Sequence, residues 1–296
     1  MSSRPPLVSV GIPTYNRHLL IARAIVSVLR QDYPNVEIVV SDNCSTDSTS
    51  SVCLELAASD VRIRYVRQPH NIGATRNFNA VLAQATGEFF MWLGDDDWID
   101  VGYVGSCVKP LICDQTMSLV SGASKYYRDG KKVYEGKLFS LPRKSWWLRV
   151  ISYYWQVADN GMFYGVMRTE QIRQIEIKNT MGGDWLMIAR IVSMGKSEVI
   201  PETSIHRELG GASASYQQIA ASLGISRIYA IFPMSTIAMS AWLDVVAKGA
   251  AYKDHSIFVR LAVACGVFAV IMAKSVLVYS RAAARHIIRL LSKLVG

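Results

Sequence analysis

The sequence is poor in the residues that hold small secreted folds together. It has only five cysteines in 296 residues, and they form neither a Cys-x-x-Cys pair nor a Cys/His cluster with the spacing of a zinc site. We therefore expect neither a disulfide framework nor a structural zinc ion, and we expect reduced thiols. The residues before Leu7 contain no apolar run typical of an export signal, which predicts that the chemistry faces the cytoplasm.

Charged residues are also scarce, at 19% against 51% hydrophobic residues, which excludes a disordered chain and predicts a full core. The net charge of +9 permits an anionic partner, such as nucleic acid, a phosphorylated small molecule or an acidic lipid surface. Nucleic acid is disfavoured, because the basic residues concentrate beside apolar segments near the C-terminus. The remaining charges that we expect to be solvated are Lys131, Lys132, Arg143 and Lys144.

Residues 7 to 97 alternate short apolar runs with helical patterns, which predicts βαβ units around a mostly parallel sheet. The expected strands are 7–12, 36–40, 63–66 and 89–93. Helices are expected between them: one with Leu20, Ala24 and Val28 on its apolar face, one running towards Ala58, and one ending near Gln84.

Polar clusters follow three of the expected strands, at 13–17, 42–47 and 95–97. In open α/β sheets ligands bind beyond the carboxyl ends of the strands, so these clusters predict one site. Three adjacent carboxylates, Asp95, Asp96 and Asp97, repel one another unless a divalent cation binds them. The alternative is a solvated acidic turn, which the apolar strand before the cluster makes less favourable. A metal held by few carboxylates keeps positions open for substrate phosphates.

These segments together resemble glycosyltransferase family 2. The resemblance rests on Val-Ser-Val-Gly-Ile-Pro-Thr-Tyr-Asn-Arg at 8–17, on Glu-Ile-Val-Val-Ser-Asp-Asn-Cys-Ser-Thr-Asp at 37–47, and on Gly-Glu-Phe-Phe leading to Leu-Gly-Asp-Asp-Asp at 87–97. It covers the first hundred residues closely and the next hundred loosely. No family pattern is found beyond about Ser215.

The resemblance implies a GT-A fold over residues 1–215, with a nucleotide-binding half, 1–97, and an acceptor half, 98–215. It implies an inverting transfer of a sugar from a nucleotide-sugar donor to an acceptor hydroxyl, with Mn²⁺ or Mg²⁺ as the cofactor. The metal ligands would be Asp95, Asp96 and Asp97, with Asp96 and Asp97 favoured. The implied donor-binding residues are Pro13, Thr14, Tyr15, Arg17, Asp42, Asn43, Arg76, Asp95, Asp96, His206 and Arg207, with Asp42 accepting from the base.

Two positions depart from the family pattern. Many relatives have another Asp where Gly94 stands, so the roles within the acidic run are ambiguous by one position. The family's Arg-Asn pair would put an Arg where Phe78 precedes Asn79, so either Arg76 substitutes for it or Arg76 is a surface residue.

Inverting transfer needs a carboxylate that takes the acceptor's proton, and Asp184 is the candidate. It follows Gly182-Gly183, which allow close backbone approach, and opens a helical pattern. By itself Asp184 could be only an N-cap, but the family has an acidic residue at this order and distance. Downstream, the segment from His206 to Ser213 resembles a flexible basic Gly-Gly-Ser segment whose charges assist nucleotide departure, although a lone histidine is often structural.

The middle of the chain, 98–181, is rich in aromatic residues, which predict core and loop packing or a platform that stacks on a sugar. The region 216–296 is expected to be helical. Its apolar run 257–279 is interrupted by Arg260 and Lys274, leaving 13 residues between them, and a basic amphipathic pattern follows at 281–293. This favours an anchor in the membrane plane over a span. A buried helical hairpin or an oligomer interface is the alternative.

A membrane element would imply peripheral attachment to the inner face of the cell membrane, with a lipid-linked or cell-surface glycan as acceptor. The alternative function is an inactive relative that only binds a nucleotide-sugar. A phosphoacceptor signalling domain is disfavoured, because its acid pair follows the first strand rather than the fourth. The sequence leaves the nucleotide, the sugar and the oligomeric state open.

Overall fold

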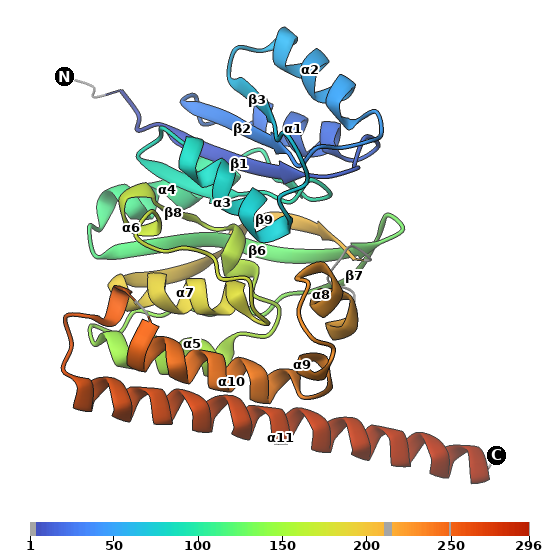
Figure 1. Ribbon diagram of the computed structural model, residues 1–296, viewed down its shortest axis with the longest axis vertical. Helices are drawn as coiled ribbons and strands as arrows, with labels where there is room; N and C mark the ends of the chain where they lie inside the picture. Colours follow the sequence, from blue (N-terminus) through green and yellow to red (C-terminus); the bar gives the residue numbers. More distant parts are fainter. Residues whose placement is uncertain (1–3, 210–214, 249, 296) are drawn as a thin grey trace.

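The described residues form one mixed sheet of nine strands, which runs through the molecule (Figure 1). The computed structural model describes residues 4–209, 215–248 and 250–295, the stretch from 281 on by its backbone alone. The strand order is β3-β2-β1-β4-β8-β6-β9-β5, and β7 pairs with β6. The strands are β1 (Val8–Thr14), β2 (Val36–Asp42), β3 (Ile63–Arg67), β4 (Phe89–Trp92), β5 (Trp98–Ile99), β6 (Met117–Arg128), β7 (Lys131–Glu135), β8 (Val166–Arg168) and β9 (Lys196–Glu208).

Helices cover both faces of this sheet and form the base of the molecule (Figure 1). The α-helices are α1 (Ile21–Leu29), α2 (Thr49–Ser59), α3 (Ala74–Gln84), α4 (Tyr103–Cys113), α5 (Trp146–Gln156), α6 (Thr169–Ile172), α7 (Gly183–Met194), α8 (Tyr216–Ser222), α9 (Ile228–Ile231), α10 (Pro233–Leu243) and α11 (Ile257–Val295). Short 3₁₀ turns are η1 (Gly161–Tyr164) and η3 (Ala250–Tyr252), and η2 (Asp244–Lys248) is a π turn.

The N-terminal half is the parallel βαβ unit that the sequence predicts. β3, β2, β1 and β4 are parallel neighbours, so their carboxyl ends meet at one edge. Two strands are longer than expected: Pro13 and Thr14 belong to β1 rather than to a turn, and β2 continues to Asp42. β4 pairs with β1 only as far as Gly11, so one side of β1 is unpaired at Pro13. Proline has no backbone N–H, and at this position its absence removes no hydrogen bond between β1 and β4.

The second half of the sheet is mixed rather than parallel. β8 runs antiparallel to both β4 and β6, whereas β9 runs parallel to β6. The two-residue strand β5 was not expected from the sequence; it pairs with Ile205 and His206 of β9. The acidic run 95–97 therefore spans the gap between β4, in the middle of the sheet, and β5, at its edge.

Alternate residues of the central strands point to two separate cores, as the two-residue period of a strand requires. Val8, Val10 and Ile12 pack with α1 and α4 on one face, and Phe90 and Trp92 pack with α3, α5 and α7 on the other. Several aromatics of the middle segment are core residues: Tyr103, Tyr126, Tyr153, Tyr154 and Phe163 are buried, whereas Trp147 and Trp155 are exposed.

The C-terminal region packs on the helices beside the second half of the sheet. α10 and α11 lie side by side below α5 and α7 (Figure 1). α11 is one continuous helix rather than an apolar segment and a separate basic helix. Its segment Ile257–Val278 is long and apolar enough to cross a membrane by length and composition, with 28% of it buried against the rest of the fold. The basic side chains at 281–293 lie outside the described side chains.

A buried ion pair fastens this region to α7. Asp244, 2% exposed at the end of α10, accepts from Arg190 Nε of α7 at 2.9 Å and from Arg190 Nη2, and from Lys178 Nζ at 2.8 Å. Two cations and a carboxylate that share hydrogen bonds offset the cost of their burial, and removal of one partner leaves an uncompensated charge.

We expect Asp244→Ala to lower the free energy of unfolding by about 3–5 kcal/mol, because the Arg190 guanidinium would stay buried without its partner. Chemical denaturation followed by circular dichroism measures this loss. Glu135→Ala, which breaks the exposed pair of Glu135 with Lys132, is the control and leaves the unfolding curve unchanged. A wild-type curve for Asp244→Ala would contradict the anchoring role.

Candidate active site

Three adjoining cavities open at the carboxyl ends of the parallel strands. The acidic cavity, about 450 Å³, includes most of the predicted donor-binding residues: Pro13, Thr14, Tyr15, Arg17, Asn43, Asp95, Asp96 and Arg207, together with Asp97. The central cavity, about 230 Å³, shares Phe78, Tyr164 and Arg207 with it and contains Asp184. The outer cavity, about 470 Å³, shares Asp159, Gly182 and Asp184 with the central one.

The acidic run lies on the wall of the first cavity rather than in open solvent. Asp95 lies 3.6 Å from Arg17 Nε, and burial together with the charge of Asp96 raises the pKa of Asp95 to about 6. Asp97 is 3% exposed and accepts from the backbone N–H of Glu208 at 3.1 Å. Burial raises the pKa of Asp97 too, against the lowering effect of Arg207. The cluster thus disfavours full ionisation and favours an added cation.

Gly94 makes room for these carboxylates. A Cβ at this position would lie 2.7 Å from Asp97 Oδ2 and 3.2 Å from Asp96 Oδ1, so the two side chains face the space beside Gly94. An aspartate at position 94 is therefore incompatible with this arrangement. Within the described residues, no three His, Cys, Asp or Glu side chains come together as a metal site. The donor set that fits is a pair of carboxylates, Asp96 and Asp97, with the remaining positions left to water and phosphate oxygens.

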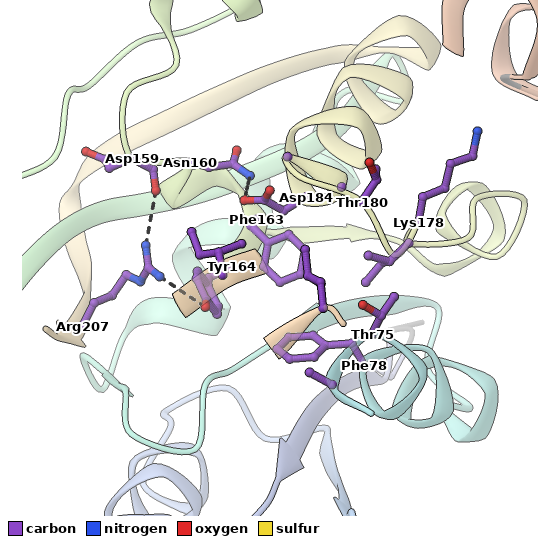
Figure 2. Close-up of a pocket in the computed structure, with 16 residues that line it drawn as sticks. Thr75, Phe78, Asp159, Asn160, Phe163, Tyr164, Lys178, Thr180, Asp184 and Arg207 are labelled. Atoms are coloured by element: carbon purple, nitrogen blue, oxygen red, sulfur yellow. Dashed lines mark hydrogen bonds between the residues drawn. The ribbon is translucent and has the colours of Figure 1, made fainter. Parts of the chain in front are cut away.

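Arg207 forms the wall between the acidic and central cavities. Its guanidinium lies 4.5 Å from the ring centre of Tyr164, and Nε lies 3.6 Å from Asp97 Oδ2. Its Nη1 donates to the Tyr126 hydroxyl at 2.9 Å and to the Asp159 carbonyl at 3.4 Å. Its Nη2 donates to the Tyr164 hydroxyl at 3.3 Å; Figure 2 shows the bonds to Asp159 and Tyr164. Nε has no hydrogen-bond partner among the described atoms, and the anion that it faces is the Asp97 carboxylate.

Asp184 lies at the junction of the central and outer cavities, in the first turn of α7. Both positions before it require glycine. Gly182 has φ +71°, and a Cβ there would lie 2.9 Å from Ile237 Cγ1. A Cβ on Gly183 would lie 2.1 Å from the Lys178 carbonyl oxygen. The N-cap is Gly182, so Asp184 is not the cap. Burial raises the pKa of Asp184, and a hydrogen bond from Asn160 opposes the rise (Figure 2).

Three predicted donor-binding residues do not line the acidic cavity. Asp42 is fully buried beneath it, where it accepts from Ser45 N and the Tyr65 hydroxyl, both at 2.8 Å, and so shapes the loop. Arg76 lines a different cavity beside Asn179.

His206 is the third, and both of its ring nitrogens are occupied. Its ring stacks on Trp98 at 5.1 Å, Nε2 contacts Asp100 Oδ1 at 2.8 Å, and Nδ1 contacts the Tyr127 hydroxyl at 3.0 Å. The lone histidine therefore holds β5 and β9 together. Gly210 to Ser213, the rest of the predicted basic segment, lie outside the described residues.

Sequence reasoning missed Tyr164, which lines both the acidic and central cavities, and Asn160, which bonds to Asp184. The only local signal was the turn sequence Asp159-Asn160-Gly161, in which Asn160 adopts φ 51°. A turn sequence of this kind predicts a residue in the left-handed backbone conformation, but it does not predict that the Asn160 side chain contacts Asp184 in the first turn of α7.

Comparison with known proteins identifies the family. The profile of "Glycosyl transferase family 2" matches residues 9–175. The putative colanic acid biosynthesis glycosyl transferase WcaA of Escherichia coli (strain K12) is 30% identical over 206 residues, which are 67% of this chain and 71% of WcaA. A GalNAc(5)-diNAcBac-PP-undecaprenol beta-1,3-glucosyltransferase of Campylobacter jejuni is 45% identical over 105 residues, 35% of this chain, and the match spans only 34% of that relative's length.

Solved structures share the fold. The S. aureus TarS 1–349 structure with UDP-GlcNAc superposes with a TM-score of 0.62 at 19% identity, over 87% of this chain and 70% of that one. A mannosyltransferase from Pyrobaculum calidifontis, in complex with GDP-Man and Mn²⁺, gives a TM-score of 0.56 at 19% identity, over 94% and 80%. These structures confirm the α/β fold expected from the motifs. The family profile and the WcaA match show that the chain is a glycosyltransferase and belongs to glycosyl transferase family 2.

Proposed function

We propose that the protein moves one sugar, with inversion, from a nucleotide-sugar in the acidic cavity to an acceptor hydroxyl in the outer cavity. The observation that carries this is the position of Asp184 at the junction of the central and outer cavities, because the central cavity adjoins the acidic cavity that Asp95, Asp96 and Asp97 line. A carboxylate that opens to an acceptor space on one side and lies near an anion-binding wall on the other suits a single displacement.

In this reaction Asp184 takes the proton of the acceptor hydroxyl while its oxygen bonds to the anomeric carbon. The bond from that carbon to the diphosphate oxygen breaks, and the nucleoside diphosphate leaves with the electron pair. Arg207 lines both the acidic and the central cavity, so its positive charge is suited to stabilise the charge that develops on the leaving diphosphate.

Asp96 and Asp97 are the residues that we propose hold Mn²⁺ or Mg²⁺. A divalent ion there would neutralise diphosphate oxygens in the departing nucleotide. The raised pKa of Asp95 and of Asp97 supports this proposal, because a neighbouring cation is what returns such crowded, buried carboxyls to the ionised form. The mannosyltransferase of similar fold was solved with GDP-Man and Mn²⁺.

We propose that the acceptor is a lipid-linked or cell-surface glycan, met at the inner face of the membrane. The base of the molecule exposes an apolar surface made by three helices: Ile228, Ile231, Phe232, Met239, Leu243, Phe258 and Val276, here called the apolar base. Ile237 lines the outer cavity, and Met239 and Leu243 are exposed on the same helix, so α10 contributes to both the acceptor space and the apolar base. The Campylobacter relative is named for an undecaprenol-linked acceptor.

An attachment in the membrane plane suits this helix arrangement better than a span. Lys274 of α11 donates to the carbonyls of Tyr154 and Val157, at and just beyond α5, and its ammonium lies 5.5 Å from the Trp185 ring centre. A helix that crosses the bilayer would have to give up these bonds to the acceptor half.

The first experiment identifies the donor and separates an enzyme from a protein that only binds. A thermal-shift panel of UDP-, GDP- and dTDP-sugars with and without Mn²⁺ selects the donor, because a selective ligand raises apparent stability by mass action. Donor turnover with membrane-extracted acceptors then tests transfer. Donor binding without turnover under all these conditions would favour the binding-only alternative.

We expect Asp184→Asn to lower kcat by about 10²–10⁴-fold, the usual contribution of a general base, with donor binding retained. In the wild-type protein kcat/KM falls as the pH falls through the pKa of Asp184, since only the ionised carboxylate accepts the proton. Burial raises that pKa, so the acid limb lies at higher pH than for an exposed aspartate. Glu170→Gln, an exposed acid in the first turn of α6, is the control. Wild-type turnover by Asp184→Asn would exclude the base role.

We expect Gly94→Ala to weaken Mn²⁺-dependent donor binding by about tenfold while the fold persists, because the new Cβ displaces the Asp96 and Asp97 carboxylates. Isothermal titration with and without Mn²⁺ measures the change. Gly102→Ala is the matched control, since its Cβ would meet Asp32 Oδ2 at an ordinary 3.7 Å. Equal affinities for both variants would argue against a metal beside Gly94.

We expect the double variant Phe232→Glu, Phe258→Glu to lose about tenfold in binding to vesicles that contain anionic lipid, since both rings are exposed on the apolar base. Sedimentation with vesicles measures the bound fraction. Leu54→Glu, on exposed α2 at the far end of the molecule (Figure 1), is the control. A wild-type protein that never sediments with vesicles would refute membrane attachment.

A further inference from the structure

A tyrosine and an asparagine form a buried hydrogen-bond chain behind Asp184. The Tyr153 hydroxyl of α5 donates to Asn160 Oδ1 at 2.7 Å, and Asn160 Nδ2 donates to Asp184 Oδ2 at 2.8 Å. Tyr153 is 0% exposed and Asn160 is 5% exposed. The chain joins α5, the turn before η1 and the start of α7, three elements that are separate in sequence.

The tyrosine fixes which way the amide points. Burial raises the pKa of Tyr153 well above that of an exposed tyrosine, so its hydroxyl remains a donor at every pH of interest. An amide nitrogen has no free lone pair, so that donor can bond only to Asn160 Oδ1, which turns the NH₂ group towards Asp184. The reversed amide would set two acceptor oxygens against each other at 2.8 Å.

The backbone at Asn160 is held in a conformation that few side chains adopt. Its φ and ψ are 51° and 38°, in the left-handed region, and its carbonyl accepts from Phe163 N at 3.0 Å to begin η1. Asparagine tolerates this region better than other side chains. The adjacent carbonyl of Asp159 accepts from Arg207, so one turn contacts both the base and the cation beside Asp97 (Figure 2).

We propose that Asn160, oriented by Tyr153, is a positioning residue that holds the Asp184 carboxylate through Oδ2 and leaves Oδ1 to take the acceptor's proton. The inference rests on the proposed transfer reaction and assigns to Asn160 no contact with substrate. The backbone N–H groups of Asp184 and Trp185 also stabilise this carboxylate, but Oδ1 accepts from no described side chain. Fixing one oxygen also fixes the plane in which the other accepts.

Other charged or titratable groups face Asp184 from every side of the cavity. Tyr153 and Tyr154 lie on α5, Tyr164 on η1 and Arg207 on β9, and Asp159 and Lys178 share the cavity wall. Lys178 is paired with Asp244, and the positive charge of Arg207 favours ionised Asp184. Asn160 is the side-chain hydrogen-bond donor in this set, and its loss makes ionisation of Asp184 harder.

The test compares Asn160→Gly and Tyr153→Phe with the wild-type enzyme in the donor-transfer assay. Glycine removes the amide and adopts the left-handed backbone without strain. We expect kcat to fall about tenfold for Asn160→Gly and less for Tyr153→Phe, with an unchanged KM for the donor. We also expect the acid limb of the pH profile to move to higher pH in both variants, with partial recovery of turnover at alkaline pH.

Asp129→Gly is the matched control, since Asp129 has the same φ of 51° in the exposed β6–β7 turn, far from the cavities. A merely structural role predicts lower melting temperatures for both test variants with a wild-type pH profile, and that result overturns the proposal. If Asp184→Asn is inactive but Asn160→Gly has wild-type turnover and a wild-type pH profile, only the positioning role of Asn160 is refuted. Full turnover by Asp184→Asn, or no transfer by the wild-type chain, refutes the proposed function and this inference together.

Discussion

The contact between Arg207 and Asp97 joins the two halves of the site. Asp97 follows β4 in the parallel half, whereas Arg207 comes from β9 in the mixed half, and the two charges lie 3.6 Å apart with Asp97 3% exposed. Neither would be tolerated alone at that depth, because an unpaired buried charge is strongly unfavourable. Each half of the sheet therefore completes the other, and the cleft can form only when β9 is in register beside β6.

The same register brings further partners to the acidic run. Glu208, next to Arg207, donates its backbone N–H to Asp97, and Arg23 donates to the Asp96 carbonyl at 2.5 Å while it stacks on Trp98 at 3.9 Å. The loop that carries the carboxylates is thus fixed through its backbone, and the Asp96 side chain is left without a hydrogen bond from the described part of the chain. A preorganised loop with one free carboxylate is suited to bind a cation, because little free energy is lost in rearranging the loop.

The sequence predicted those features that depend on local periodicity. The four parallel strands and the acidic cluster at their ends were expected within about two residues, because strand period and strand-end chemistry are local properties. Asp184 was predicted by family resemblance, and its glycine pair by backbone freedom. The contacts of Asp42, His206 and Asn160 were not predictable, because each is made with a residue distant in sequence: Tyr65 for Asp42, Trp98 for His206, and Tyr153 for Asn160.

The C-terminal helices pack on the layer formed by α5 and α7. Lys274 interrupts the apolar pattern of α11, and the sequence offered no reason for it; the structure uses it to bond to the backbone of Tyr154 and Val157. The same ammonium lies over Trp185, the residue after Asp184, and Ile237 of α10 packs against Gly182. A shift of α10 and α11 would therefore move the residues that flank Asp184, so the position of the Asp184 carboxylate depends on how these two helices are held.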